Sequence, residues 1–424
     1  MSELEPVSQA IDEFLALCIS NSIDTVVVAL SGGVDSLSLL HALYQATRDS
    51  SHNFSLSAVY VDHQLQAGSE QWAKQNQGFC ERLDIPFQSV QIEVDKDSAS
   101  LENAARKARY QALSELIQNP QTCLVTGQHL NDQAETFLLQ LFRGAGSKGL
   151  SAMPHWTNFA GGYLARPLLN VSRNLLEAYC QSHDLEPIED PTNQDTDIRR
   201  NFVRHEVMPL IEKKWPQVSK VIASASQVQA ENQQLLDELA AIDFEACFGV
   251  RSNSLLLAQA RLLSPQRFRN LLRYWLGACG ADMPSQAVLE QIQIQMLDAK
   301  GDANPVIEMG SGSIRRYRDG LYWVTESGKD YSGLELIWST KNDLVHNEQI
   351  LISLEWLQQN YPNLVGKKLT VKGRQGGERV RFEPGKPSVS LKNYFQDLGV
   401  PPWLRAQVLL LRFEGEVRAV YLPV

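Results

Sequence analysis

Short apolar runs alternate with longer stretches of helical periodicity in the first half of the chain. The runs lie at 25–30, 56–62, 87–92 and 122–126, and the helical patterns lie at about 36–47, 69–84, 99–118 and 130–143. Strands separated by helices are typical of a parallel sheet covered on both faces. The pattern therefore predicts an α/β fold in which ligands bind at the carboxyl ends of the strands.

The hydrophobic pattern changes twice after this region. Residues 216–300 are Gln-rich and helical in period, without a run of strands, and residues 314–324 predict a hairpin with Asp319 and Gly320 at the turn. After about 345 the chain is rich in strand and turn signals. We therefore predict an α/β domain at 1–215, a mostly helical middle domain at 216–340 and a small α+β domain at 341–424.

Composition excludes several classes of protein. The 424 residues are 43% hydrophobic and 21% charged, which is ordinary for a soluble globular protein. No apolar run approaches the roughly 18 residues of a membrane span, and the acidic N-terminus lacks a signal-peptide pattern, so we expect a cytoplasmic protein. The six cysteines form no CxxC pair, which predicts reduced thiols and no zinc or iron–sulfur site.

The net charge of −10 hides a local excess of basic residues. From Lys367 to Arg405 there are nine Lys and Arg against three acidic residues, a local balance of +6 that leaves −16 for the rest of the chain. Taken whole, the net charge argues weakly against a nucleic-acid partner, but such an asymmetry is more informative than the total.

The first candidate site is the loop SGGVDS, residues 31–36. It joins a buried strand to a helix, where backbone N–H groups and the positive end of the helix dipole favour an anion. Gly32 and Gly33 let a phosphate approach, Val34 begins the helix, and Ser31 and Ser36 add hydroxyl donors. The absence of lysine excludes a Walker-type loop.

Asp35 within this loop would repel phosphates unless a divalent cation bridged the two, so the loop predicts nucleotide phosphate with Mg²⁺. The alternative is a plain βα turn in which Asp35 stabilises the first turn of the helix.

Other polar residues follow the remaining strands. Asp62 ends the second strand and suits either a ribose or adenine contact or a loop cap. Arg109, with Glu102, Arg106 and Tyr110 at helical spacing, can hold a phosphate or a carboxylate, or belong to a solvated ion-pair face.

The segment TGQHLNDQAET, residues 126–136, opens a helix after the fourth strand. Asp132 and Glu135 lie three residues apart, close to His129. They can hold Mg²⁺, capture an ammonium group or take a proton from an attacking amine, or they can simply complement the helix dipole. Further on, the cluster Arg199, Arg200 and Arg204 indicates phosphate contacts or a solvated helix end.

Taken together, these motifs resemble those of a known family. SGGVDS, VDH, ExxARxxRY, TGxHxxDxxET, RGxG, RPLL and EDPTNxDxxxxRNxxR are similar, in this order, to the motifs of the tRNA(Ile)-lysidine synthases, which belong to the ATP pyrophosphatase (PP-loop) superfamily. Three positions depart from the family pattern: Gln128 replaces a histidine, Asn131 an aspartate, and Gln66 an arginine. Within this segment, function is therefore carried over to His129 and Asp132 and not to Gln128 or Asn131, and any role of the family's arginine at position 66 is in doubt.

The resemblance implies a Rossmann-like PP-loop domain and a ligase that uses ATP, Mg²⁺ and L-lysine to convert the wobble cytidine of tRNA(Ile) with a CAU anticodon to lysidine. The implied ATP-binding residues are Ser31, Gly32, Gly33, Val34, Asp35, Ser36 and Asp62, with Asp35 meeting Mg²⁺–pyrophosphate. The implied catalytic residues are Asp35, Arg109, His129, Asp132 and Glu135. The implied tRNA-binding residues are Arg199, Arg200, Arg204, Lys372, Arg374, Arg379, Arg381 and Lys392. A homodimer is also expected.

Three alternatives remain. A tRNA thiolase on the same scaffold commonly needs a cysteine pair, which the chain lacks. In a small-molecule amidoligase, the basic C-terminal segment would have no function. A non-catalytic RNA-binding protein would have no need of Asp35, Asp132 and Glu135.

Overall fold

The computed structural model describes residues 5–49, 53–64, 68–94, 101–249, 254–297, 305–325, 331–381 and 387–422. Gln66 and the side chain of Glu102 lie outside the described part. The chain divides into two compact units, Met1–Leu235 and Leu236–Val424.

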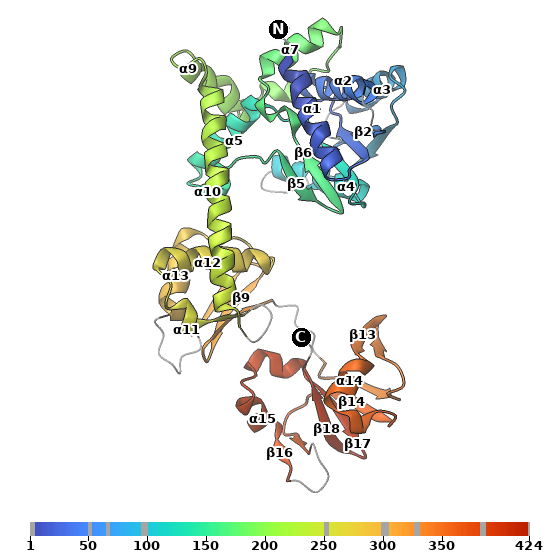
Figure 1. Cartoon of the computed structure of the whole chain (residues 1–424), viewed down its shortest axis with the longest axis vertical. Helices are drawn as coiled ribbons and strands as arrows, with labels where there is room; N and C mark the ends of the chain where they lie inside the picture. The colour runs from blue at the N-terminus through green and yellow to red at the C-terminus, as the bar shows by residue number, and fades with distance from the viewer. Residues whose placement is uncertain are drawn as a thin grey trace. The chain divides into compact units, whose positions relative to one another are not determined.

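The first unit is built on a six-stranded sheet (Figure 1). Its strands are β1 (Thr25–Ala29), β2 (Ser55–Asp62), β3 (Phe87–Gln91), β4 (Thr122–Val125), β5 (Trp156–Phe159) and β6 (Gly162–Ala165), in the order β3-β2-β1-β4-β6-β5. All neighbouring strands run parallel except β5, which is antiparallel to β6. The predicted parallel sheet is confirmed, and β5 and β6 extend it at an edge that the sequence pattern had not indicated.

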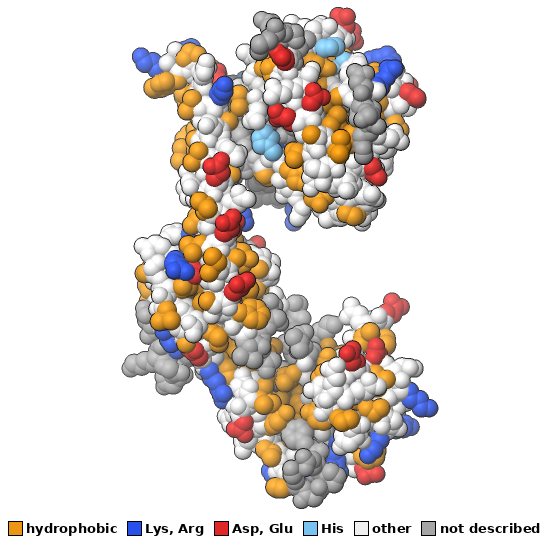
Figure 2. All heavy atoms as spheres, in the orientation of Figure 1, with side chains coloured by type: hydrophobic (Ala, Val, Ile, Leu, Met, Phe, Trp, Pro, Cys, Tyr) orange, Lys and Arg blue, Asp and Glu red, His pale blue; other side chains and the backbone are white. Residues whose placement is uncertain are grey.

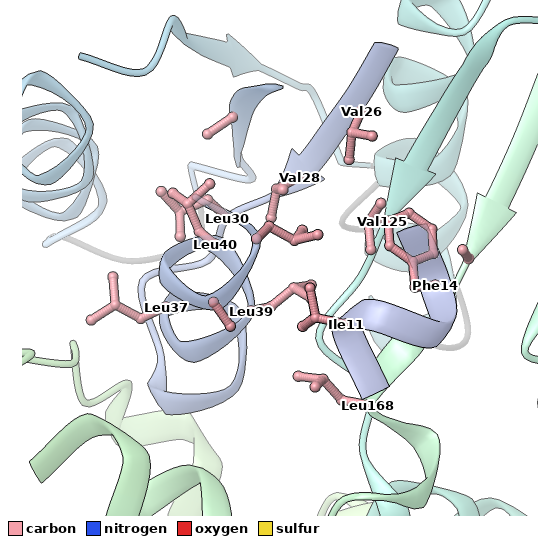
Figure 3. Close-up of a cluster of buried hydrophobic side chains, with 14 of the residues drawn as sticks. Ile11, Phe14, Val26, Val28, Leu30, Leu37, Leu39, Leu40, Val125 and Leu168 are labelled. Carbon is pink, nitrogen blue, oxygen red and sulfur yellow. The ribbon is translucent and has the colours of Figure 1, made fainter. Parts of the chain in front are cut away.

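Helices cover both faces of this sheet. They are α1 (Glu5–Ser20), α2 (Val34–Asp49), α3 (Ser69–Arg82), α4 (Leu101–Leu116), α5 (Leu130–Phe142), α6 (Ser147–Leu150), α7 (Arg173–Ser182), α8 (Arg199–Phe202) and α9 (Met208–Glu212). Alternate residues of β1 enter two different cores, as a pleated strand requires. Val26 and Val28 pack with α1 and α2 (Figure 3), whereas Val27 and Ala29 pack against the cluster that contains Leu113 of α4.

The order of the strands places the loops after β1 and β4 side by side. β2 lies on one side of β1 and β4 on the other, so the chain direction across the sheet reverses between these two strands. In open α/β sheets ligands bind at such a switch point. Gly127 marks the close approach: a Cβ there would lie 2.9 Å from the carbonyl carbon of Asp35 and from the nitrogen of Ser36.

We therefore expect Gly127→Ala to push the 31–36 loop away from its position. Because the contacts are with backbone, the substitution should destabilise the protein by about 1–3 kcal/mol and raise the KM for ATP. Thermal unfolding and ATP kinetics measure the two effects. Gly146→Ala is the matched control, since a Cβ at that position has no neighbour within 4 Å. Equal effects of the two substitutions would contradict the close-approach argument.

A 30-residue helix, α10 (Val218–Cys247), leads into the second unit. There the sheet β7-β10-β9-β8 packs with α11–α13 around Phe268 and Trp275. The elements are β7 (Ser254–Leu256), α11 (Leu257–Ala260), α12 (Pro265–Ala278), α13 (Gln286–Ile292), β8 (Val306–Met309), β9 (Gly312–Tyr317) and β10 (Gly320–Val324).

One expectation for this region needs correction. The hairpin is present, but its turn lies one residue earlier than predicted, because Tyr317 pairs with Gly320 and leaves Arg318 and Asp319 as the loop. Arg318 takes the left-handed conformation there, with φ of 54°. Between 216 and 300, where no run of strands was predicted, the structure has the single strand β7, which is only three residues long and pairs with β10 from a distant part of the sequence.

The end of the chain forms a six-stranded sheet in the order β11-β14-β17-β18-β15-β16, with a β12–β13 hairpin and two helices. The elements are β11 (Glu335–Trp338), β12 (Leu344–His346), β13 (Gln349–Ile352), α14 (Leu354–Asn360), β14 (Leu369–Gly373), β15 (Arg379–Val380), β16 (Val389–Ser390), α15 (Leu391–Asp397), β17 (Leu409–Phe413) and β18 (Glu416–Tyr421). β11 joins this sheet although it lies before residue 340. Within the described ranges, no helix is long and apolar enough to cross a membrane.

Candidate active site

The 31–36 loop is fixed by one hydroxyl group. The Ser36 Oγ accepts hydrogen bonds from the backbone nitrogens of Ser31 (3.2 Å) and Gly32 (3.1 Å) and donates to the carbonyl of Gly33 (3.2 Å). Gly32 has φ of 86°, and a Cβ there would lie 2.4 Å from Ile188 Cδ1, so this position requires glycine. The sequence thus places Gly32 where the turn has no room for a side chain.

A cavity of about 400 Å³ lies beneath this loop at the carboxyl ends of β1, β2 and β4. Its lining combines polar groups with apolar and aromatic side chains. Its lining includes Ser31, Gly33, Asp35, Ser36, Tyr60, His63, Trp72, Arg109, Gln128 and Asp132. Such a lining suits a nucleotide, because the two faces of the base are apolar and the phosphates are anionic.

Asp35 and Asp132 line the cavity, and the fully buried His129 lies close to both carboxylates. His129 Nε2 lies 3.5 Å from Asp35 Oδ1 and 3.5 Å from Asp132 Oδ2, and Arg173 Nη1 lies 3.9 Å from Asp35 Oδ2. Asp35 Oδ1 is buried and accepts no hydrogen bond from any described residue. Burial raises the pKa of Asp35, and the nearby Asp132 raises it further, although His129 and Arg173 oppose the shift. A cation bound next to Asp35 would therefore stabilise its ionised form.

The acidic pair of α5 is bound by two arginines. Glu135 is almost fully buried and accepts from Arg200 Nε (2.8 Å) and Arg204 Nε (2.6 Å), while Asp132 Oδ1 accepts from the Nη2 groups of both arginines at 2.9 Å each. Asp132 and Glu135 are three residues apart and Arg200 and Arg204 four apart, so each pair presents one helix face to the other. Asp132 Oδ2 also accepts from the backbone nitrogen of His129 at 3.1 Å.

These contacts determine which groups are charged. Burial alone would raise the pKa of Asp132, but His129, Arg200 and Arg204 together hold it below its usual value. Burial would lower the pKa values of Arg200 and Arg204, but Asp132 and Glu135 raise both. The contacts thus favour the ionised forms of Asp132, Arg200 and Arg204.

Arg204 lies in a distorted turn of helix, and Pro209 explains the distortion. Between α8 and α9 the helix widens into a π-helical turn at Val203–Val207. Proline has no N–H to bond the carbonyl four residues earlier and its ring crowds that carbonyl, which locally disrupts the α-helical pattern. Such π turns are frequent at functional sites.

A second cavity, of about 280 Å³, adjoins the first. The two share Arg109, Gln128, Asp132 and Asn193 as lining residues. The second is further lined by Arg106, Thr192, Ile198, Arg200, Asn201 and Arg204. Its walls therefore combine one carboxylate with several guanidinium groups, which suits a ligand that carries both an amine and an acidic group.

Arg109 stands between the cavities as a cation without a carboxylate partner among the described residues. Its guanidinium lies 5.7 Å from the Tyr110 ring. Burial lowers its pKa, and the nearby Arg106 and Arg200 lower it further. An anion in either cavity would relieve this repulsion.

Two of the remaining sequence-predicted residues lie apart from the cavity lining. The Val34 side chain packs into the hydrophobic core behind the loop. Asp62 is buried and its Oδ1 accepts from the backbone nitrogen of Gln64 at 2.8 Å, as a loop cap does. Asn131, one of the family departures, accepts from the backbone nitrogen of Arg173 at 3.1 Å.

The basic residues of the C-terminal domain are mostly engaged with neighbours. Lys372 pairs with Glu335 at 2.8 Å, Arg381 with Glu416 at 2.8 Å, and Arg374 lies 3.8 Å from Glu378. Arg379 donates to the hydroxyl of Ser388, whereas Lys392 is exposed. Their contact with tRNA stays a prediction, as it does for Arg199, Arg200 and Arg204.

Sequence reasoning missed several lining residues. Trp72 and Tyr60 come from stretches without a recognised motif, and Asn193 lies within one that had been assigned no role. Gln128 was set aside as a departure, yet it lines both cavities. Arg173, which approaches Asp35 but lines neither cavity, begins α7 four residues beyond the RPLL segment and belongs to no recognised motif.

Comparisons with known proteins agree with this geometry. Residues 5–211 match the family model described as a PP-loop domain, residues 255–322 a TilS substrate binding domain, and residues 369–421 a TilS substrate C-terminal domain. A tRNA(Ile)-lysidine synthase of Vibrio campbellii is 37% identical over 93% of this chain and 90% of its own length. The chain belongs to the tRNA(Ile)-lysidine synthase family.

Other relatives place it in the same family. The tRNA(Ile)-lysidine synthase of Shigella flexneri is 37% identical over 92% of this chain and 90% of its own length. Among solved structures, the U34-tRNA thiolase NcsA from Methanococcus maripaludis has 17% identity and a TM-score of 0.46, covering 54% of this chain and 79% of that one. The expected PP-loop fold and ATP-using ligase class are confirmed by the family; the domain boundaries near 215 and 340 stay predictions.

Proposed function

We propose that this protein converts the wobble cytidine of tRNA(Ile) with a CAU anticodon to lysidine, consuming ATP and L-lysine and releasing AMP and pyrophosphate. One observation carries the proposal: a nucleotide-sized cavity under the SGGVDS loop opens into a second cavity, and Asp132 and Arg109 line both. A two-step reaction with an activated intermediate needs two such adjoining sites.

In the first step the cytosine O2 attacks the α-phosphorus of ATP and pyrophosphate leaves. The 31–36 loop would hold the phosphates, and Arg109 would neutralise charge that develops on them. Asp35 would hold Mg²⁺ together with the departing pyrophosphate. The fit is good because Mg²⁺ commonly takes one or two carboxylates plus substrate phosphates, and the buried Asp35 Oδ1 accepts no hydrogen bond from the described residues. Bound there, the ion supplies charge stabilisation.

In the second step the ε-amine of lysine attacks C2 and AMP leaves. The amine has a reference pKa of about 10.4 and arrives protonated. The surrounding cations hold the pKa of Asp132 below its usual value, so Asp132 stays ionised and is a weak base. It would therefore orient the ammonium group without keeping the proton of that group. His129, whose Nε2 lies 3.5 Å from both Asp132 and Asp35, would accept that proton by way of the Asp132 carboxylate as the amine attacks.

The charge balance of the second cavity refines the expected lysine site. Asp132 and Glu135 had suggested an acidic pocket, but Arg200 and Arg204 offset both charges. An amino acid brings a carboxylate as well as amines, and the guanidinium groups of this cavity would pair with that carboxylate. We also propose that the basic C-terminal segment binds the tRNA and that the protein is a homodimer.

The decisive experiment is mass analysis of tRNA(Ile) after incubation with the protein, ATP and labelled lysine. We expect one lysine per tRNA, located at the wobble position, with AMP and pyrophosphate formed in equal amount. The same tRNA with uridine at that position is the control and should gain no label. Pyrophosphate exchange without tRNA would favour a small-molecule ligase, and sulfur incorporation a thiolase.

A further inference from the structure

Two neutral amide side chains lie where the two cavities join. Gln128 and Asn193 line both cavities, and the other two shared lining residues, Arg109 and Asp132, are charged. Asp132 already accepts hydrogen bonds from two guanidinium groups. The two amides are therefore the neutral groups of this junction that can distinguish a donor from an acceptor on a ligand.

The amide of Gln128 is held in one orientation. Thr126 is buried, and its hydroxyl donates to Gln128 Oε1. The other acceptor near that hydroxyl is the carbonyl of Ala165, which lies 3.5 Å away and already accepts from the backbone nitrogen of Thr126 at 3.1 Å. The network thus assigns the Oε1 end of the amide to Thr126. The end left for a ligand is Nε2, which can only donate.

The amide of Asn193 has no such lock. The backbone of Asn193 is fixed, because its nitrogen donates to the carbonyl of Asp190 at 3.1 Å and its carbonyl lies 2.8 Å from His205 Nε2. Its side chain is exposed and makes no hydrogen bond with a described residue. Half a turn of this amide exchanges its oxygen and nitrogen ends, so Asn193 can donate or accept at the same point.

The chemistry of the two steps locates the target base at the junction, and this argument rests on the proposed function. The cytosine O2 attacks the nucleotide in the first cavity, and the lysine amine reaches C2 from the second cavity. These two atoms are bonded to each other, so they lie where the cavities meet. The ring neighbours of C2 are N1, which carries the ribose, and N3, which is open to a protein contact. In cytosine N3 is an acceptor, whereas in uracil it carries a hydrogen and donates.

We propose that Gln128, oriented by Thr126, selects cytosine by donating a hydrogen bond from Nε2 to N3 of the wobble base. With uridine at this position two donors would face each other, and each would lose water without gaining a partner. Unstacked bases are commonly read on this edge. Asn193 adds contact area but no preference, because its amide can turn to suit either base.

Equilibrium binding of tRNA(Ile) to the full chain tests the selection. L-lysine and an α,β-methylene analogue of ATP are present, so that the cavities are filled and the first step is blocked. We expect the tRNA with cytidine at the wobble position to bind about tenfold more tightly than the same tRNA with uridine there. We expect a similar loss with 3-deazacytidine, which has a C–H group in place of N3 and keeps the other groups of cytosine.

The ratio of affinities isolates the base from the rest of the tRNA. Figure 2 shows Lys and Arg side chains on the surfaces of both units. Contacts of such side chains with phosphates are the same whichever base occupies the wobble position, so they cancel in the ratio.

Variants separate the locked amide from the free one. Gln128→Leu should weaken binding of the cytidine tRNA and bring all three tRNAs to about equal affinity. Thr126→Val keeps the amide but removes the hydroxyl that orients it, so the preference should fall, and Thr126→Ser should restore it. Asn193→Leu is the matched control: it removes the other amide from the same junction and should leave the ratios unchanged. Circular dichroism and thermal unfolding check that each variant folds.

Several results would overturn the selection by Gln128. They are equal binding of the three tRNAs by the wild type, an unchanged ratio in Gln128→Leu or Thr126→Val, and a ratio lost equally in Asn193→Leu. Lysidine formation with ordinary ATP is measured alongside. If the wild type forms no lysidine, the proposed function itself fails. If lysidine forms while the ratio in Gln128→Leu is unchanged, only the role of Gln128 fails.

Discussion

Replacing Asp35 with asparagine should lower the rate of tRNA-dependent pyrophosphate release by about 10³-fold, because the charge stabilisation that a metal ion supplies amounts to several kcal/mol. Asparagine keeps the shape of Asp35 but has no charge to hold the ion. The apparent Mg²⁺ requirement should rise in parallel. Pyrophosphate release as a function of Mg²⁺ concentration measures both effects.

The same substitution should leave folding intact or improve it. Burial raises the pKa of Asp35, so the folded state binds its proton more tightly than the unfolded state does. Stability from this group is therefore present at low pH and is lost as the pH rises through the folded pKa. At neutral pH the ionised Asp35 is a net cost, which asparagine removes.

Asp24→Asn is the matched control, since Asp24 precedes the same strand β1 at its opposite end and is exposed. It should change neither activity nor Mg²⁺ dependence. If Asp35→Asn kept full activity, or lost activity only in proportion to lost folding, Asp35 would be a helix-stabilising residue and the Mg²⁺ assignment would fail.

The sequence pattern predicted the parallel sheet well because its signals are local. Strands β1 and β3 lie within one residue of the apolar runs at 25–30 and 87–92. A parallel sheet then brings the carboxyl ends of its strands to one edge, which is why Asp35, His129 and Asp132 meet as the motifs suggested. Periodicity and topology were sufficient for this part of the site.

The partners of the acidic pair could not be predicted in the same way. Arg200 and Arg204 lie more than 60 residues beyond Asp132 and Glu135, and an arginine-rich helix end has the same local appearance whether it binds phosphate or a buried carboxylate. Their matching helical spacings become informative only when α5 and α8 are known to be neighbours. Likewise β5 and β6 are short, and their pairing depends on the sheet edge offered by β4.

Replacing Glu135 with leucine should destabilise the protein by about 3–5 kcal/mol, because two largely buried guanidinium groups would be left with Asp132 alone. Denaturant unfolding measures the loss. The control is Glu335→Leu, which removes the partner of Lys372 from an exposed pair and should cost less than about 1 kcal/mol. Comparable losses would mean that the buried cluster contributes no more than a surface pair.

The double variant Glu135→Leu with Arg204→Met separates stability from catalysis. It removes one buried charge of each sign, so much of the lost stability should return. Lysidine formation should not return, because Arg204 lines the second cavity and contacts Asp132 at 2.9 Å, and both features are lost with it. ATP binding, which depends on the first cavity, should be close to normal in the refolded double variant. If lysidine formation recovered together with stability, the role of Glu135 and Arg204 would be structural. Asp132 and Arg200 would then be the groups that contact the amino acid.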